Sequence, residues 1–355
     1  MVNSISTFNT DEAALAEREG KNATVLGNLN FRKAFSLAIN RTDFAQAYTA
    51  AGSAGYGMLN YMYVYDPFTG ASYRNSDGAK AALCKLYGLT WGEDGDFEDL
   101  DEAYDAITGY DLTAAREAMQ LAYEETTADG TYDGGDVTLV ISVYKSDDVY
   151  VQMFNYLDNA LKEAAVGTGF EGKVALEMKV DEDYYDSMYS GSADMIFSTW
   201  GGAAYSPFTL LYECYCDAGI NDDPNQMEYG FDSNAVYVAL KINGHQFVET
   251  LQTWARWMDA QDITLTSQDG ELTLDAFGNY DAESRCNLFA GMEYVYLANY
   301  VNTPIYYRNV GSLVSQKGDY AVTEYVDLVG FGGIAFYTYN YTDAEWAEVA
   351  GTLEY

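Results

Sequence analysis

Histidine, proline and cysteine are scarce in this sequence, which has one histidine, four prolines and four cysteines among 355 residues. Most zinc sites use several nitrogen or sulfur ligands, which His245 alone does not supply, and no cysteines have the C-x-x-C spacing of a metal site. A Ser-His-Asp or Cys-His catalytic arrangement would also have to use His245. This histidine begins a segment that we predict to be helical, so we interpret it as a structural residue. We therefore expect no metal, no cofactor and no catalytic residue. The four cysteines are Cys84, Cys214, Cys216 and Cys286. In an exported protein they could form two disulfides.

Positive charge is also scarce, since 18 lysines and arginines face 55 aspartates and glutamates, for a net charge of −37. This charge repels phosphate backbones and anionic membrane surfaces, so we expect no nucleic acid partner. The acidity mainly indicates a soluble surface, with a preference for cationic ligands as the alternative. No apolar run reaches the about 18 residues of a membrane span, and the N-terminus lacks a basic segment followed by an apolar one. The chain is therefore either intracellular or a mature or trimmed form of an exported protein.

Apolar and aromatic residues are plentiful. Hydrophobic residues make up 48% of the chain, which is enough for a substantial core, and 355 residues favour two lobes over one. The 34 tyrosines offer flat apolar faces with a polar tip, which suit peptides and sugars alike. The plainer explanation for so many tyrosines is that tyrosine has a high propensity for β-strands.

The middle of the chain has the most regular pattern. Alternating apolar residues predict strands at 136–144, 173–180 and 193–200, and helices are predicted between them at 149–165 and 182–191. This β-α-β-α-β order with short connections predicts a parallel sheet in an α/β fold. Ligands of such sheets bind outside the carboxyl ends of the strands.

Further elements follow from periodicity and from helix-ending signals. We predict one helix over 28–52, capped by Asn28 or Asn30 and stopped by Gly52. The acidic run 93–102 lacks the glycine of a calcium-binding loop and is read as a solvated loop. The remaining predictions are helices at 111–125, 245–261 and 281–300, and a strand–turn–strand at 303–316.

The segment after the third strand is the candidate binding site. Trp200 is followed by Gly201, Gly202 and Ala203, whose small side chains leave the backbone open to a ligand's main chain. Tyr144, Tyr150 and Tyr205 are candidate walls of the same site. The plainer alternatives are an ordinary turn at the glycines, a core position for Trp200 and a sheet-surface position for Tyr144.

Four segments resemble the oligopeptide-binding family, the extracellular solute-binding proteins of peptide ABC transporters. NLNFRKAFSLAINRTDF at 28–44 is similar to the helix with the family pattern Val-Arg-x-Ala, then Ala-Ile-Asp/Asn-Arg. GSADMIFSTWGGAAYSPFTLL at 191–211 is similar to a family segment that ends in Gly-Trp-x-x-Asp-Tyr-x-Asp/Glu-Pro. YDLTAAREAMQLAYEE at 110–125 resembles a family helix, and TPIYYRNVGSLVSQ at 303–316 resembles a late family strand.

The resemblance implies a periplasmic-binding-protein-like lobe, with a central, mostly parallel sheet flanked by helices. It implies that residues 28–317 form lobe II, the C-terminal lobe of such a receptor. Residues 1–27 would be a strand and linker from lobe I, and 318–355 returning strands of lobe I. We expect the terminal strands, 1–10 and 318–345, to pair with each other or with a neighbouring molecule, because most of their sheet would be absent.

The implied function is that of the solute-binding component of an ABC importer, which binds peptides or peptide-like ligands and docks on permease subunits. The implied location is the cell surface, where a lipid anchor outside this chain would hold the protein. Ala203 stands where peptide-binding members often have an aspartate that pairs with the peptide's amino group. An oligosaccharide receptor of the same superfamily, an extracellular carbohydrate-active enzyme and an interaction domain without a small ligand therefore remain alternatives.

Overall fold

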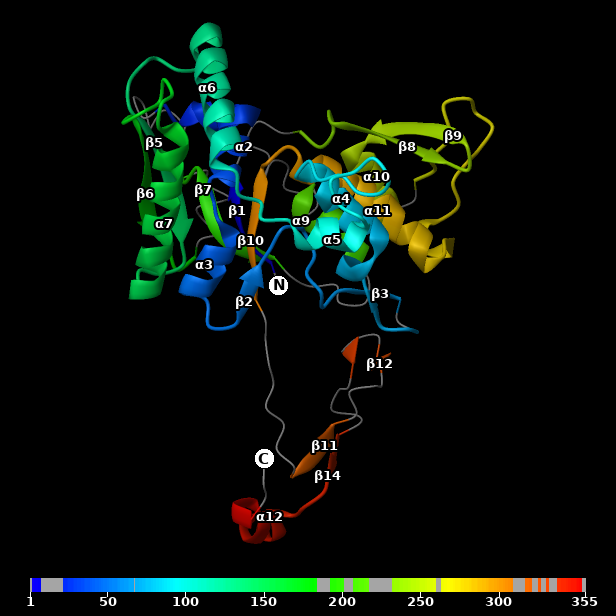
Figure 1. The fold of residues 1–355 in the computed structure, drawn as a ribbon. Coiled ribbons are helices and arrows are strands. Elements are labelled where there is room, and N and C mark those ends of the chain that lie inside the picture. The colour runs from blue at the N-terminus through cyan, green and yellow to red at the C-terminus, as the bar shows by residue number, and fades with distance from the viewer. Residues whose placement is uncertain are drawn as a thin grey trace.

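A six-stranded sheet with strand order β2-β10-β1-β7-β5-β6 is the centre of the computed structural model (Figure 1). The structure describes residues 2–7, 22–66, 68–183, 192–200, 207–216, 232–259, 263–308, 317–320, 325–326, 330–331 and 337–352. The strands of this sheet are β1 (Val2–Thr7), β2 (Gly52–Ala54), β5 (Val137–Val143), β6 (Val174–Val180), β7 (Met195–Trp200) and β10 (Asn302–Arg308).

Half of the sheet is parallel, as the sequence predicts. Strand β5 pairs in parallel with β6 and with β7, and helix α7 (Asp148–Ala165) connects β5 to β6. Almost every residue of β5 is buried, on both faces, which is typical of a central parallel strand. The α/β fold with parallel strands is thus confirmed, although three of the five pairings in this sheet are antiparallel, so the sheet is mixed and not mostly parallel. The helix predicted at 182–191 falls largely on residues 184–191, which lie outside the described part of the chain.

The other half of the sheet is antiparallel. Strand β1 lies between β7 and β10 and is antiparallel to both, and β10 pairs antiparallel with β2. The expectation that the first strand pairs with residues 318–345 is therefore wrong for residues 2–7. A short polar strand can fill a central position when neighbours on both sides supply hydrogen bonds, and its own sequence does not identify those neighbours.

Helices α2 (Leu29–Leu37), α3 (Arg41–Tyr48), α6 (Leu112–Asp129) and α7 pack against one face of the sheet. Phe31 of α2, Met119 of α6 and Leu157 of α7 pack with the apolar residues of β5 in one buried cluster. The predicted helices 111–125 and 149–165 correspond to α6 and α7, because their apolar residues repeat at the helical period.

The single helix predicted over 28–52 is wrong, since the segment forms two helices. The side chain of Asn28 accepts a hydrogen bond from the Phe31 amide at 3.1 Å and caps α2. The side chain of Asn40 accepts one from the Asp43 amide at 3.2 Å and starts α3 in a new direction. Gly52 does not end a helix, because it begins β2.

A second core lies beside the first and is mainly helical. Trp254, Trp257 and Phe289 are among its buried residues. Cys84, Cys216 and Cys286 have free thiols. The elements of this part are β3 (Val64–Asp66), β4 (Ala71–Ser72), α4 (Asp77–Leu86), α5 (Leu100–Asp105), α9 (Leu210–Tyr215), β8 (Tyr237–Ile242), β9 (His245–Thr250), α10 (Leu251–Met258) and α11 (Ala282–Leu297).

The helix predicted over 245–261 is also wrong, because its first six residues form strand β9. Asn243 and Gly244 have φ angles of 50° and 89° and form the turn between β8 and β9. Asn-Gly is the strongest short signal for a two-residue hairpin turn. Helix α10 begins only after Thr250, whose side chain accepts a hydrogen bond from the Thr253 amide.

The last described segments form small elements of their own. They are β11 (Gly318–Tyr320), which pairs with β14 (Tyr337–Tyr339), then β12 (Tyr325–Val326), which pairs with β13 (Gly330–Phe331), and α12 (Asp343–Val349). None of these strands joins the six-stranded sheet. Their assignment to a second lobe stays a prediction. No helix in the described ranges is both long and apolar enough to span a membrane.

Candidate ligand-binding edge of the sheet

The carboxyl ends of four strands lie along one edge of the six-stranded sheet. Strands β5, β6 and β7 are parallel, and β10 points the same way because both β7 and β10 are antiparallel to β1. Val2 of β1 pairs with Trp200 on one side and with Tyr307 on the other, so the ends of β7 and β10 flank the start of β1. This edge is where ligands of parallel sheets bind.

Three of the predicted site residues lie at this edge. Trp200 is the last residue of β7, as predicted. Tyr144 directly follows β5, and 46% of its surface is exposed. Tyr150 lies in the first turn of α7 and is half-buried. The other four predicted residues, which lie outside the described part of the chain, are Gly201, Gly202, Ala203 and Tyr205.

The connection from β5 to α7 is charged and already paired within itself. The Lys145 ammonium lies 2.6 Å from an Asp147 carboxylate oxygen and 5.7 Å from the centre of the Tyr150 ring. Asp147 also accepts a hydrogen bond from the Tyr150 amide and caps α7. The hydrogen bond from Lys145 lowers the pKa of Asp147, so the carboxylate stays ionised at neutral pH. Since Asp147 caps the helix N-terminus and Lys145 lies over the Tyr150 ring, the exposed side chain of Tyr144 is the surface here that is left to a ligand.

Sequence reasoning missed a further aromatic residue at the edge. The ring of Tyr61 meets that of Tyr307 edge-on at 5.8 Å, near the end of β10, and 46% of Tyr61 is exposed. The Tyr307 hydroxyl accepts hydrogen bonds from the amides of Tyr56 and Gly57, which holds the loop before Tyr61 against the sheet. The aromatic run Tyr61-Met62-Tyr63 is visible in the sequence, but only the fold shows that it lies beside β10.

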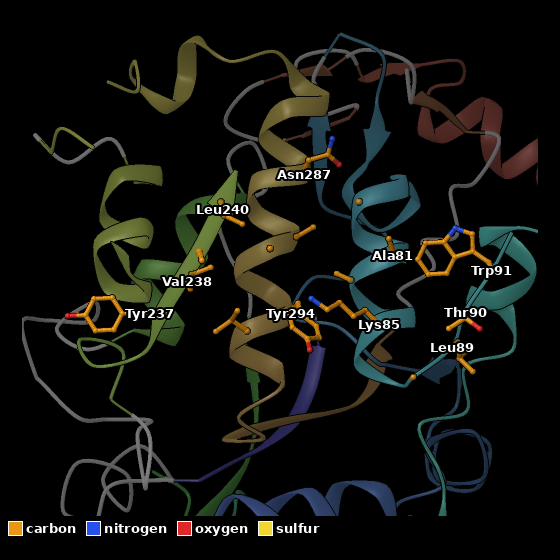
Figure 2. A pocket seen from close by; sticks show the side chains of 17 residues that line it. Ala81, Lys85, Leu89, Thr90, Trp91, Tyr237, Val238, Leu240, Asn287 and Tyr294 are labelled. Carbon is orange, nitrogen blue, oxygen red and sulfur yellow. The ribbon is translucent and has the colours of Figure 1, made fainter. Parts of the chain in front are cut away.

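A separate groove of about 700 Å³ lies between α4, α11 and β8 (Figure 2). Small residues of the two helices form its floor, and none of the predicted site residues lines it. Lys85 of α4 and Tyr294 of α11 meet within it, with the ammonium 3.9 Å from the ring centre. Trp91 forms one wall. The groove can accept an apolar group with a negative charge beside Lys85.

The sequence matches the family model described as bacterial extracellular solute-binding proteins, family 5 Middle, over residues 3–222. A search among curated proteins found no match.

Solved structures with a similar fold are receptors of peptide transporters. The substrate-binding domain of an oligopeptide ABC transporter from Bacillus anthracis has a TM-score of 0.50 at 11% identity, over 86% of this chain and 43% of that one. Peptide-bound OppA from Listeria monocytogenes has a TM-score of 0.50 at 12% identity, over 96% of this chain and 49% of that one. A peptide-binding protein of a peptide ABC transporter has a TM-score of 0.50 at 13% identity, over 86% of this chain and 97% of that one.

The chain thus spans less than half the length of the first two proteins and nearly all of the third. At these identities the likeness shows a shared fold. The family match is stronger evidence, because it extends over more than half of the sequence. The protein belongs to the bacterial extracellular solute-binding proteins of family 5.

Proposed function

We propose that this chain is the ligand-binding lobe of a peptide receptor that delivers its ligand to an ABC importer. The observation that carries the proposal is the common edge at which β5, β6, β7 and β10 end, within a family of extracellular solute-binding proteins. In this proposal residues 28–317 form lobe II together with β1 and residues 22–27, which pack with its sheet, and 318–355 belong with lobe I. A lipid anchor outside this chain holds the receptor at the cell surface beside its permease subunits.

The ligand lies along the sheet edge and is recognised mainly through its main chain. Trp200, Gly201, Gly202 and Ala203 present backbone N–H and C=O groups, as an edge strand does to an added strand. Tyr144, Tyr150 and Tyr205 contact its side chains. Ala203 offers no carboxylate to a free amino terminus, so peptides without a free terminus at that position bind as well as peptides with one.

The location of the site is tested with the full chain and a mixture of short peptides. Peptides that stay bound are identified by native mass spectrometry, and their affinity is measured by calorimetry. Tyr144→Ala removes an aromatic contact of about 1 kcal/mol, so we expect about fivefold weaker binding. The matched control is Trp91→Ala, which removes an exposed aromatic residue of the groove and is expected to bind normally. Weaker binding in Trp91→Ala alone would place the ligand in the groove instead.

A second variant tests main-chain recognition. Gly202→Val adds a branched side chain where the ligand backbone would approach, so we expect weaker binding with an unchanged circular dichroism spectrum. Unchanged peptide affinity would refute the role of 201–203. An oligosaccharide mixture is measured in parallel: retention of sugars but not peptides supports the sugar-receptor alternative, and their hydrolysis supports the enzyme alternative.

A further inference from the structure

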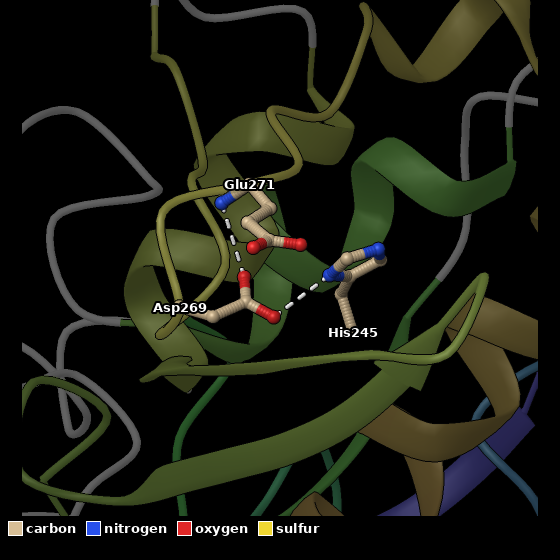
Figure 3. Close-up of side chains that lie close together, drawn as sticks. All are labelled: His245, Asp269 and Glu271. Atoms are coloured by element: carbon tan, nitrogen blue, oxygen red, sulfur yellow. Dashed lines mark hydrogen bonds and ion pairs between the residues drawn. The ribbon is translucent and has the colours of Figure 1, made fainter.

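Three side chains with metal-binding atoms meet at the β8–β9 hairpin, in the second core (Figure 3). His245 is the first residue of β9, and Asp269 and Glu271 lie in the loop that follows α10. One nitrogen of His245 and one carboxylate oxygen from each acid all lie within 4.8 Å of one another. Among the residues that the structure describes, this is the one group of three or more histidine, cysteine or acidic side chains that is so close together.

Backbone contacts bring the two segments together. The Gln268 amide donates a hydrogen bond of 2.8 Å to the Gln246 carbonyl, which fixes the loop beside β9. Thr266 and Thr273 form an isolated antiparallel bridge that closes the loop on itself. Gly270, with a φ of 74°, makes the turn that places Asp269 and Glu271 on the same side. The backbone therefore holds the segments that carry these three residues side by side.

Asp269 is already oriented toward His245. Its Oδ1 accepts hydrogen bonds from the Ser267 hydroxyl at 2.6 Å and from the Glu271 amide at 3.1 Å. Its Oδ2 lies 2.8 Å from Nδ1 of His245. Hydrogen bonds of this kind to the outer oxygen orient a carboxylate ligand and reduce the entropy lost on metal binding. Figure 3 shows the Glu271 carboxylate turned toward the same space.

We propose that His245, Asp269 and Glu271 bind a divalent transition-metal ion, with Zn²⁺ as the best match. One imidazole and two carboxylates suit Zn²⁺, whereas Ca²⁺ and Mg²⁺ prefer oxygen ligands alone. The proton between His245 and Asp269 is released to solvent, the two atoms move apart as the ion binds between them, and water completes the coordination. The net charge of −37 raises the concentration of cations at the surface. The site ties the hairpin to the loop and lies away from the six-stranded sheet, so it is independent of peptide binding.

The single histidine makes the test direct. In protein labelled with ¹⁵N-histidine, the ring signals come from His245 alone, and we expect Zn²⁺ to shift them. Calorimetry with ZnCl₂ on the metal-free chain should show one site, which is lost in His245→Ala and at least about tenfold weaker in Glu271→Gln. The matched control is Asp94→Asn, which removes one negative charge from an acidic loop elsewhere and should bind Zn²⁺ normally.

Three results would overturn the proposal. Ring signals that do not respond to Zn²⁺ would show that His245 is not a ligand. Equal losses in Glu271→Gln and Asp94→Asn would show general attraction by charge. Binding of CaCl₂ as tight as that of ZnCl₂ would show that the imidazole contributes nothing. Glu271→Gln keeps the test valid if His245→Ala fails to fold.

Discussion

Arg74 and Glu293 form an ion pair inside the helical core, where neither side chain is exposed. Glu293 also accepts hydrogen bonds of 2.8 Å from the Met58 amide and from the Tyr73 hydroxyl. Arg74 donates one to the Leu59 carbonyl at 3.0 Å. A buried ion pair is stable when hydrogen bonds satisfy its remaining atoms, as they do here. The pair joins α11 to the loop that carries Tyr61 to the edge of the sheet.

We predict that Glu293→Gln lowers the free energy of unfolding by about 3 kcal/mol, because the buried guanidinium of Arg74 loses its counter-charge. Urea unfolding followed by circular dichroism measures this change. The control is Asp101→Asn, which breaks the Lys80–Asp101 pair, where 71% of the aspartate side chain is exposed. Its effect should stay below about 1 kcal/mol. Equal effects of the two variants would contradict a special role for burial.

At the scale of elements, periodic segments could be predicted from the sequence and junctions could not. Strands β5 to β7 and helices α6, α7 and α11 lie within a few residues of their predicted ranges, because their apolar periods are clear. The single helix predicted over 28–52 is wrong because the apolar residues continue across the break at Asn40. The helix predicted over 245–261 is wrong because the Asn243-Gly244 turn places residues 245–250 in a hairpin strand.

Only the part of the candidate site that lies in one continuous segment could be predicted from the sequence. The end of β7 at Trp200 follows from one strand and the glycines after it. Tyr61 could not be placed at the same edge, because its neighbour Tyr307 is far away in the sequence. The same limit applies to the groove and to the proposed metal site, whose residues come from separate segments.

The second Asn cap leads to a prediction about α3. Asn40→Ala removes the side-chain acceptor of the Asp43 amide, so we expect the free energy of unfolding to fall by about 1 kcal/mol. Thermal and urea unfolding measure the difference. Gln46→Ala, an exposed change within the same helix, serves as the control and should alter stability by less than about 0.5 kcal/mol. If Asn40→Ala is as stable as this control, the cap does not define the start of α3.

Tyrosine side chains pack in both hydrophobic cores and against the six-stranded sheet. Phe44, Phe197 and Tyr306 pack against one another on the sheet, while Tyr73 and Phe289 meet edge-on in the helical core. Burial raises the pKa of four tyrosines from the usual 10 to about 12; they are Tyr156, Tyr300, Tyr306 and Tyr307. Several of the 34 tyrosines therefore stabilise the cores and are not free to form a sugar-binding or peptide-binding surface.

This burial predicts how the whole molecule responds to alkali. The raised pKa values contribute stability that is complete below pH 10 and is lost as the pH rises from 10 through about 12, because the unfolded chain ionises first. We expect tyrosinate absorbance at 295 nm to rise in two stages, the later one coinciding with the loss of helical circular dichroism. A single stage near pH 10 with an unchanged spectrum would contradict the burial.

The central position of β1 also governs the order in which the molecule can form. Ile5 pairs with Phe197 and Thr303, so both neighbours of β1 are synthesised long after it. At typical rates of translation β1 waits on the order of ten seconds or more before β10 exists. Both of its edges have unpaired N–H and C=O groups until β7 is made, and one edge stays unpaired until β10 exists; these groups are free to join other chains. The sheet therefore closes late and through contacts distant in sequence, a topology that slows folding and leaves the nascent chain dependent on protection until residue 308 has emerged.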